Sequence, residues 1–192
     1  MKKLLFAALT AVLMLAGCKS KPEEEVVMVV ETTMGTVEFK LYNETPRHRD
    51  NFLKLADEHF FDGLLFHRVI DGFVIQGGDP NSREAEPGQM LGDGDLGYRI
   101  PAEIRVKEGI TCKKGSILAA REGDMVNPNR ESSACQWCFM MGPSPHLDGA
   151  YTLFGEVTSG MEVLDAIQKV ETDDYDRPLE DVKMIKVYRK TE

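Results

Sequence analysis

Positive charge is scarce in this chain. Its 192 residues include 23 lysines and arginines against 32 aspartates and glutamates, which gives a formal net charge of −9. Proteins that bind nucleic acid gain affinity when clustered basic side chains release counterions from the phosphates, and an acidic chain offers little of this. We therefore expect no nucleic-acid partner, and we interpret the acidity as a property that keeps the protein soluble.

Hydrophobic runs long enough to cross a bilayer are also missing. The longest apolar stretch covers residues 4–15, whereas a spanning helix needs roughly 20 apolar residues. Lys2 and Lys3 precede this stretch, and a short basic segment followed by a short apolar one is typical of a secretory signal. We predict that residues 1–17 are a signal peptide, without which the net charge is 21 − 32 = −11.

The residues Leu15-Ala16-Gly17-Cys18 follow at the end of this stretch. They resemble the bacterial lipobox, which implies that a peptidase cleaves before Cys18 and that the cysteine sulfur carries a diacylglyceryl group. Residues 18–25 are polar with one proline and are predicted to form a flexible tether. We expect a membrane-anchored lipoprotein on the periplasmic side of the bacterial cell envelope. An ordinary signal peptide with a chance cysteine is the alternative.

Cysteine is scarce as well, with four in the chain. A chain of this length buries a sizeable core without a disulfide scaffold. Cys135 and Cys138 have the C-x-x-C spacing of a redox or metal site, but they lie on a predicted strand, where side chains three residues apart point to opposite faces. Redox thiolates are instead stabilised at a helix N-terminus, and no histidine pair at zinc spacing accompanies Cys112. We expect no metal or redox function. Whether Cys112 forms a disulfide is left open.

Residues 26–192 show neither an internal repeat nor a second domain. A helix is predicted to begin at Thr45, a capping residue, with Pro46 in its first turn, and a second helix is predicted over residues 161–168. Many short strands with turn signals and two helices favour a mainly β fold, a closed eight-stranded antiparallel barrel capped by two α-helices. The predicted strands are residues 26–30, 36–41, 65–69, 74–76, 116–120, 137–141, 152–157 and 182–188.

Residues 66–79 have the sequence FHRVIDGFVIQGGD. This segment resembles the signature of the cyclophilins, in which an arginine, a phenylalanine and a glutamine stand at fixed offsets on a strand, a turn and a strand. The resemblance continues over residues 118–121, 132–139 and 147–155 and spans residues 26–189 in all. It implies a peptidyl-prolyl cis–trans isomerase that accelerates X–Pro isomerisation during the folding of exported proteins. It also implies proline-containing polypeptides as substrates, a monomeric state, and no metal or other cofactor.

The same resemblance assigns the site residues. It implies that Arg68 hydrogen-bonds the substrate carbonyl and the prolyl nitrogen, and that Phe73 lines the proline pocket. Gln76 and Gln136 are expected to bind the substrate backbone and to position Arg68. The other substrate-binding residues that it implies are Val74, Ala120, Arg121, Cys138, His146, Leu147 and Tyr151.

Two positions depart from the family pattern. Cys138 stands where a second phenylalanine is common, and His146 stands where an aromatic residue, often tryptophan, precedes Leu147. We therefore expect a wider and less aromatic pocket wall. The alternative function is a catalytically weak module that binds proline segments, or a chaperone of the cell envelope, although Arg68, Phe73 and the two glutamines favour catalysis.

Overall fold

The structure is a computed structural model that describes residues 25–191. The predicted signal peptide, Cys18 and the tether up to residue 24 lie outside the described residues. Within residues 25–191 the chain forms ten strands and two α-helices. Neither of these helices is long and apolar enough to cross a membrane.

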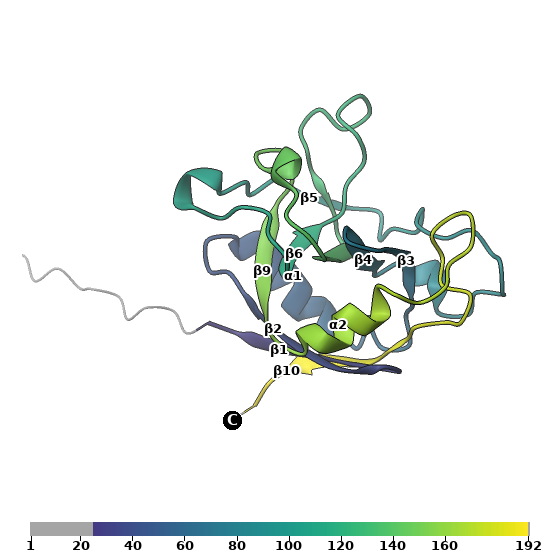
Figure 1. The fold of residues 1–192 in the computed structure, drawn as a ribbon. Helices are drawn as coiled ribbons and strands as arrows, with labels where there is room; N and C mark the ends of the chain where they lie inside the picture. The colour runs from purple at the N-terminus through teal and green to yellow at the C-terminus, as the bar shows by residue number, and fades with distance from the viewer. Residues whose placement is uncertain (1–24, 192) are drawn as a thin grey trace, which may run out of the picture.

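Eight of the strands form one antiparallel sheet that curls around the core (Figure 1). Their order across the sheet is β10-β1-β2-β9-β6-β8-β4-β3, and the two-residue strands β5 (Arg99–Ile100) and β7 (Ser132–Ser133) pair separately. The bounds of the eight strands are β1 (Val27–Thr32), β2 (Gly35–Leu41), β3 (Phe66–Ile70), β4 (Val74–Gly77), β6 (Ser116–Ala119), β8 (Trp137–Met140), β9 (Leu153–Ser159) and β10 (Met184–Arg189).

The edge strands β3 and β10 meet at a short seam rather than along a ladder. Leu65 and Lys183 form an isolated antiparallel bridge there. Farther along β3, the amide of Val69 donates at 2.8 Å to the carbonyl of Asp176, in the loop that precedes β10. This loop takes a hydrogen bond that a closing strand would need. The closed barrel expected from the sequence is therefore corrected to a mainly β fold with a curled eight-stranded sheet.

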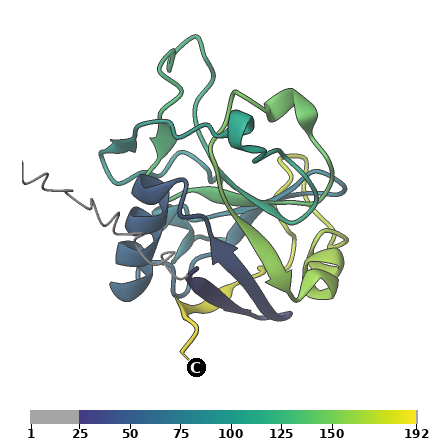
Figure 2. The ribbon, with the colours of Figure 1, turned by 90° about the vertical axis from the view of Figure 1, so that its left-hand side faces the viewer.

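The two helices lie on opposite sides of the curled sheet (Figure 2). Helix α1 (Pro46–Asp57) buries Phe52 and Leu55, and helix α2 (Met161–Ile167) buries Leu164 and Ile167, all in the same apolar core. Proline occupies the first turn of α1, as the sequence predicts. Both predicted helices are confirmed.

A residue distant in sequence caps the N-terminus of α1. Thr45 occupies the N-cap position, as the sequence predicts, but its side chain makes no capping hydrogen bond. The Glu103 carboxylate instead accepts hydrogen bonds from the amides of Arg47 and His48, at 3.2 and 3.0 Å, and contacts His48 Nδ1 at 2.7 Å. Its negative charge also complements the helix dipole. His48 Nε2 reaches Ser132 Oγ at 2.9 Å, which ties α1 to β7.

Two apolar clusters lie on the two faces of the sheet. Strand β8 contributes to both, because Trp137 and Phe139 face the inner cluster while Cys138 and Met140 face the outer one. All four side chains are buried. The buried members of the outer cluster are Val74, Cys112, Leu118, Cys138, Met140 and Leu153. This second cluster forms the floor on which the candidate site is built.

Candidate active site

A β-bulge in β3 sets the direction of Arg68. Phe66 and Arg68 lie opposite neighbouring residues of β4, and Arg68 faces Gln76, so His67 is one extra residue in the ladder. The bulge lets Phe66 and Val69 both pack into the inner cluster, although residues three apart in a regular strand point to opposite faces. Arg68 is thereby turned to the outer face, beside Gln76.

From Arg68 a row of cross-strand neighbours runs over the outer face. Gln76 lies opposite Arg68, Cys138 lies opposite Gln76, and Leu118 lies opposite Cys138. Directly opposed residues of an antiparallel pair share a face. The row therefore carries a guanidinium at one end, an amide next to it and an apolar floor at the other end.

Partly buried apolar side chains stand beside this row. Phe73, Leu147 and Tyr151 pack against the outer cluster, to which the buried Val74 belongs. The exposed ring of His146, on the 3-10 turn η3 (Pro145–Leu147), stacks on Phe73 with centroids 6.3 Å apart and planes at 25°. The structure thus brings the predicted proline-pocket residues together on one face, with His146 beside Phe73.

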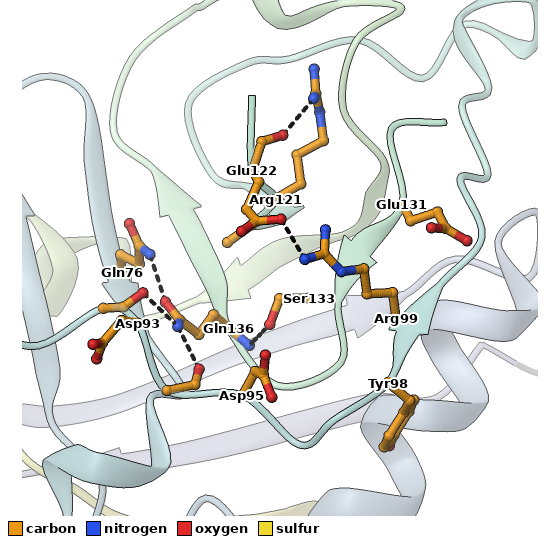
Figure 3. A pocket seen from close by; sticks show the side chains of 13 residues that line it. Gln76, Asp93, Asp95, Tyr98, Arg99, Arg121, Glu122, Glu131, Ser133 and Gln136 are labelled. Atoms are coloured by element: carbon orange, nitrogen blue, oxygen red, sulfur yellow. Dashed lines mark hydrogen bonds and ion pairs between the residues drawn. The ribbon is translucent and has the colours of Figure 1, made fainter. Parts of the chain in front are cut away.

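Gln76 and Gln136 form one hydrogen-bonded unit (Figure 3). Gln76 Nε2 donates to Gln136 Oε1 at 2.9 Å, and Gln136 Nε2 donates to the carbonyls of Gly92 and Gly94 at 2.9 and 2.8 Å. Gln136 therefore holds the loop between β4 and β5 in place. In the described part of the chain no hydrogen bond joins either glutamine to Arg68. Their contact with a substrate backbone stays a prediction.

Arg121 supports the wall formed by Tyr151. It lies two residues beyond the end of β6, and its Nε donates to the carbonyl of Ala150 at 2.8 Å. Its guanidinium lies 4.3 Å from the centroid of the Tyr151 ring and pairs with Asp124 at 2.6 Å. Because the Arg121 side chain is only 4% exposed, it acts as a buried support rather than as a solvated surface residue.

A cavity of about 230 Å³ opens next to the glutamine pair (Figure 3). Gln76, Gln136 and Ala120 contribute to its lining, together with Arg121 and with Arg99, which forms an ion pair with Glu122. Four carboxylates against two guanidinium groups give the cavity a negative character that favours a cationic group inside it. The acids that line it are Asp93, Asp95, Glu122 and Glu131.

The partner of Arg68 is a residue that the sequence analysis did not single out. Arg68 Nε lies 3.4 Å from Asp176 Oδ2, and the two side chains are 39% and 42% exposed. Asp176 belongs to the loop between α2 and β10, so its proximity to Arg68 depends on how that loop folds back onto β3. The signal available in the sequence is a turn-rich acidic run over residues 173–176, which does not indicate a partner.

Burial keeps the described cysteines protonated. Cys112, Cys135 and Cys138 are free and buried, and burial raises the pKa of Cys135 to about 11 and of Cys138 to about 12. Cys135 belongs to the inner cluster and Cys138 to the outer one, so the C-x-x-C pair faces opposite ways, as expected. Residues 25–191 hold no group of three His, Cys, Asp or Glu side chains that could bind a metal ion.

Comparisons with known proteins agree with this geometry. Residues 27–189 match the family model described as cyclophilin type peptidyl-prolyl cis-trans isomerase/CLD. The chain therefore belongs to the cyclophilin family. It is a peptidyl-prolyl cis–trans isomerase of this type, and curated relatives carry the same activity in their names.

Two of these relatives are eukaryotic. Peptidyl-prolyl cis-trans isomerase-like 1 of Neurospora crassa is 35% identical over 160 residues, which cover 83% of this chain and 91% of the relative. Peptidyl-prolyl cis-trans isomerase CYP18-2 of Arabidopsis thaliana is 35% identical over 161 residues, covering 83% and 90%. The match therefore extends over nearly the whole length of each relative.

The fold matches solved structures as well. The crystal structure of a cyclophilin-type isomerase from Cryptosporidium parvum superposes with a TM-score of 0.77 at 25% identity, covering 88% of this chain and 99% of that chain. A second structure of that protein, determined in the presence of the dipeptide Ala-Pro, superposes with a TM-score of 0.72 at 24% identity.

Proposed function

We propose that this isomerase lowers the rotational barrier of the X–Pro bond through Arg68, without a covalent step. A peptide bond resists rotation, with a barrier of ~18–20 kcal/mol, because the nitrogen lone pair is delocalised into the carbonyl. In the twisted bond the lone pair returns to the prolyl nitrogen, which becomes a better acceptor. A guanidinium donor beside that nitrogen binds the twisted bond more tightly than either planar isomer, and this differential binding accelerates the reaction.

The observation that carries the proposal is the row that runs from Arg68 to the apolar floor. A proline ring held against Phe73, Leu147 and Tyr151 leaves its nitrogen on the side of Gln76 and Arg68. The ring is then fixed while the part of the substrate before the proline turns, which limits the motion to the bond that reacts. His146 and Cys138 offer less aromatic contact than the aromatic residues that are common at these two positions in the family. The pocket therefore holds the proline ring more loosely.

Turnover distinguishes this proposal from a module that only binds proline segments. Uncatalysed X–Pro exchange takes tens to hundreds of seconds. In a protease-coupled assay on a proline tetrapeptide, we expect about micromolar enzyme to shorten the relaxation to about seconds, with saturation at high substrate. Binding of the peptide, measured by calorimetry, without any shortening of the relaxation would contradict the catalytic proposal and support the binding module.

We also propose that the enzyme acts as a monomeric lipoprotein of the cell envelope on polypeptides that have been exported. This proposal is supported by the lipobox-like residues that end in Cys18, and by the polar segment between Cys18 and the first strand. Two or more acyl chains on one residue give stable anchoring, whereas a single chain is marginal.

Replacing Cys18 by serine tests the anchor. We expect the Cys18→Ser chain to lose lipid labelling completely, because the hydroxyl cannot take the place of the thiol, and to accumulate as unprocessed precursor in a bacterial host. The matched control is Cys112→Ser, which changes a buried thiol of the domain and leaves labelling intact. Metabolic labelling with a fatty acid, followed by fractionation, measures both. A lipid-labelled Cys18→Ser product would contradict the proposal.

A further inference from the structure

We propose that Asp176 is a positioning residue for Arg68. Its carboxylate lies 3.4 Å from Nε of the guanidinium, and a contact at Nε leaves the two terminal nitrogens available to a substrate. The inference rests on the catalytic role proposed for Arg68. It adds a residue from a different element, the loop before β10, to the machinery on β3.

The loop that carries Asp176 has a fixed shape. Asp173 Oδ1 accepts hydrogen bonds from the amides of Tyr175 and Arg177, both at 2.9 Å, and the Asp173 amide donates to the Arg177 carbonyl at 2.8 Å. The Asp176 carbonyl accepts from the Val69 amide at 2.8 Å. The last contact places the Asp176 backbone beside Val69, the residue that follows Arg68 on β3. None of these contacts uses the Asp176 side chain.

A buried arginine anchors the same loop to a second one. Arg177 is 6% exposed, and its terminal nitrogen donates to the carbonyls of Glu86 and Gln89 at 2.9 and 2.7 Å. It also pairs with Asp181 at 3.2 Å. Glu86 and Gln89 belong to the loop between β4 and β5, which Gln136 also holds. Buried contacts thus fix the loop that carries Asp176 against the β4–β5 loop.

The backbone at Asp176 is in the left-handed region, with φ of 64°. Residues other than glycine adopt this region at a cost, and asparagine and aspartate tolerate it best. Glycine would take the same conformation without strain. What an aspartate adds at this position is a carboxylate beside Arg68, and such outliers cluster at functional sites. The strained residue and the ion pair are two separate observations that point to the same role.

The physical effect of the contact is preorganisation. An arginine side chain has several rotatable bonds, and its hydrogen bonds to a transition state require that they be frozen. A carboxylate that already holds Nε removes part of this cost before the substrate arrives. Because the Arg68 contact is strongest when the bond is twisted, we expect Asp176 to affect kcat more than KM.

The Asp176→Gly variant separates a positioning role from a structural one. It removes the carboxylate and relieves the backbone strain, so we expect a Tm equal to or above that of the wild type. At the same time we expect kcat to fall about 5- to 10-fold with KM changed less than about 2-fold. Asp176→Asn tolerates the left-handed conformation but removes the charge that pairs with Arg68, so kcat should fall to a similar extent. The control is Asp174→Gly, an exposed acid of the same loop, which should behave as wild type.

The Arg68→Ala variant, measured beside these, distinguishes the failure of this inference from the failure of the proposed function. In the Arg68→Ala background, Asp176→Gly should cause no further loss, because the residue that it positions is gone. If Arg68→Ala is inactive while Asp176→Gly keeps wild-type kcat, the positioning role is wrong and the role of Arg68 stands. If Arg68→Ala is fully active, the proposed function fails and the positioning role fails with it. An equal loss in Asp174→Gly, or a further loss in the double variant, would also overturn the positioning role.

Discussion

We expect the replacement of Arg68 by alanine to lower kcat/KM about 100-fold, which corresponds to about 2.7 kcal/mol of transition-state stabilisation. The reason is that the guanidinium contact is strongest when resonance in the X–Pro bond is broken. The Arg68 side chain is 39% exposed and lies on the outer face, away from the inner cluster, so the fold should tolerate the change. The coupled isomerase assay measures kcat/KM, and circular dichroism with thermal melting checks the fold.

A matched control is available on the far edge strand. Arg189 on β10 is also partly exposed and ion-paired, with Asp57 of α1. The Arg189→Ala variant removes the same side chain and one ion pair, and kcat/KM should stay within about 2-fold of wild type. If Arg68→Ala kept more than about a tenth of wild-type kcat/KM, a loss of under ~1.4 kcal/mol, Arg68 would not be the central catalytic group.

The second large effect concerns the bulged residue next to Arg68. Within residues 25–191 neither ring nitrogen of His67 has a hydrogen-bond partner, and the side chain is 3% exposed. Burial lowers the pKa of His67 from its usual 6.5 to about 4; Asp79 opposes the shift, and Arg68 and Arg177 add to it. Since one pKa unit corresponds to about 1.4 kcal/mol, the shift amounts to about 3 kcal/mol of stability.

The stability that depends on neutral His67 is fully present above pH 6.5 and is lost as the pH falls toward 4. In this interval the unfolded chain binds a proton that the folded protein does not, so acid favours unfolding. Urea titrations of wild type and His67→Leu at a series of pH values measure this. The difference in the free energy of unfolding between the two should shift by about 3 kcal/mol between pH 7.5 and pH 4, to the disadvantage of the wild type.

The control for this titration is His59→Asn, which removes an imidazole from the surface, where the His59 side chain is 67% exposed. Asparagine also tolerates the left-handed backbone of position 59, where φ is 57°. A pH-independent difference between wild type and His67→Leu would contradict the assignment of His67 as a buried neutral base.

Local patterns in the sequence predicted the elements that depend on local physics. The predicted strands over residues 26–30 and 36–41 correspond to β1 and β2, and Pro46 predicted the start of α1. Such features are predictable because a strand or a helix start is set by residues within a few positions. The FHR segment and the later motifs were located by resemblance. The structure then brought Phe73, His146 and Tyr151 to one face.

Features that depend on contacts between distant segments were not predictable in this way. Glu103 supplies the capping hydrogen bonds of α1 from 55 residues away. A local pattern shows only the adjacent Thr45. The bulge at His67 exists because Phe66 and Val69 must both reach the inner cluster, and a strand pattern alone does not show it. Asp176 meets Arg68 because its loop takes the place of β10 beside β3. The same loop is the reason that the sheet does not close into the expected barrel.

The double burial of β8 has a consequence for how the enzyme loses activity. Its four residues supply the inner cluster through Trp137 and Phe139, and they supply the floor of the candidate site through Cys138 and Met140. The floor cannot detach from the rest of the molecule without breaking the strand in the middle of the sheet. The floor of the site and the core therefore belong to one cooperative unit, in contrast to a floor built on loops that open on their own. We therefore expect this floor to be lost only when the domain unfolds as a whole.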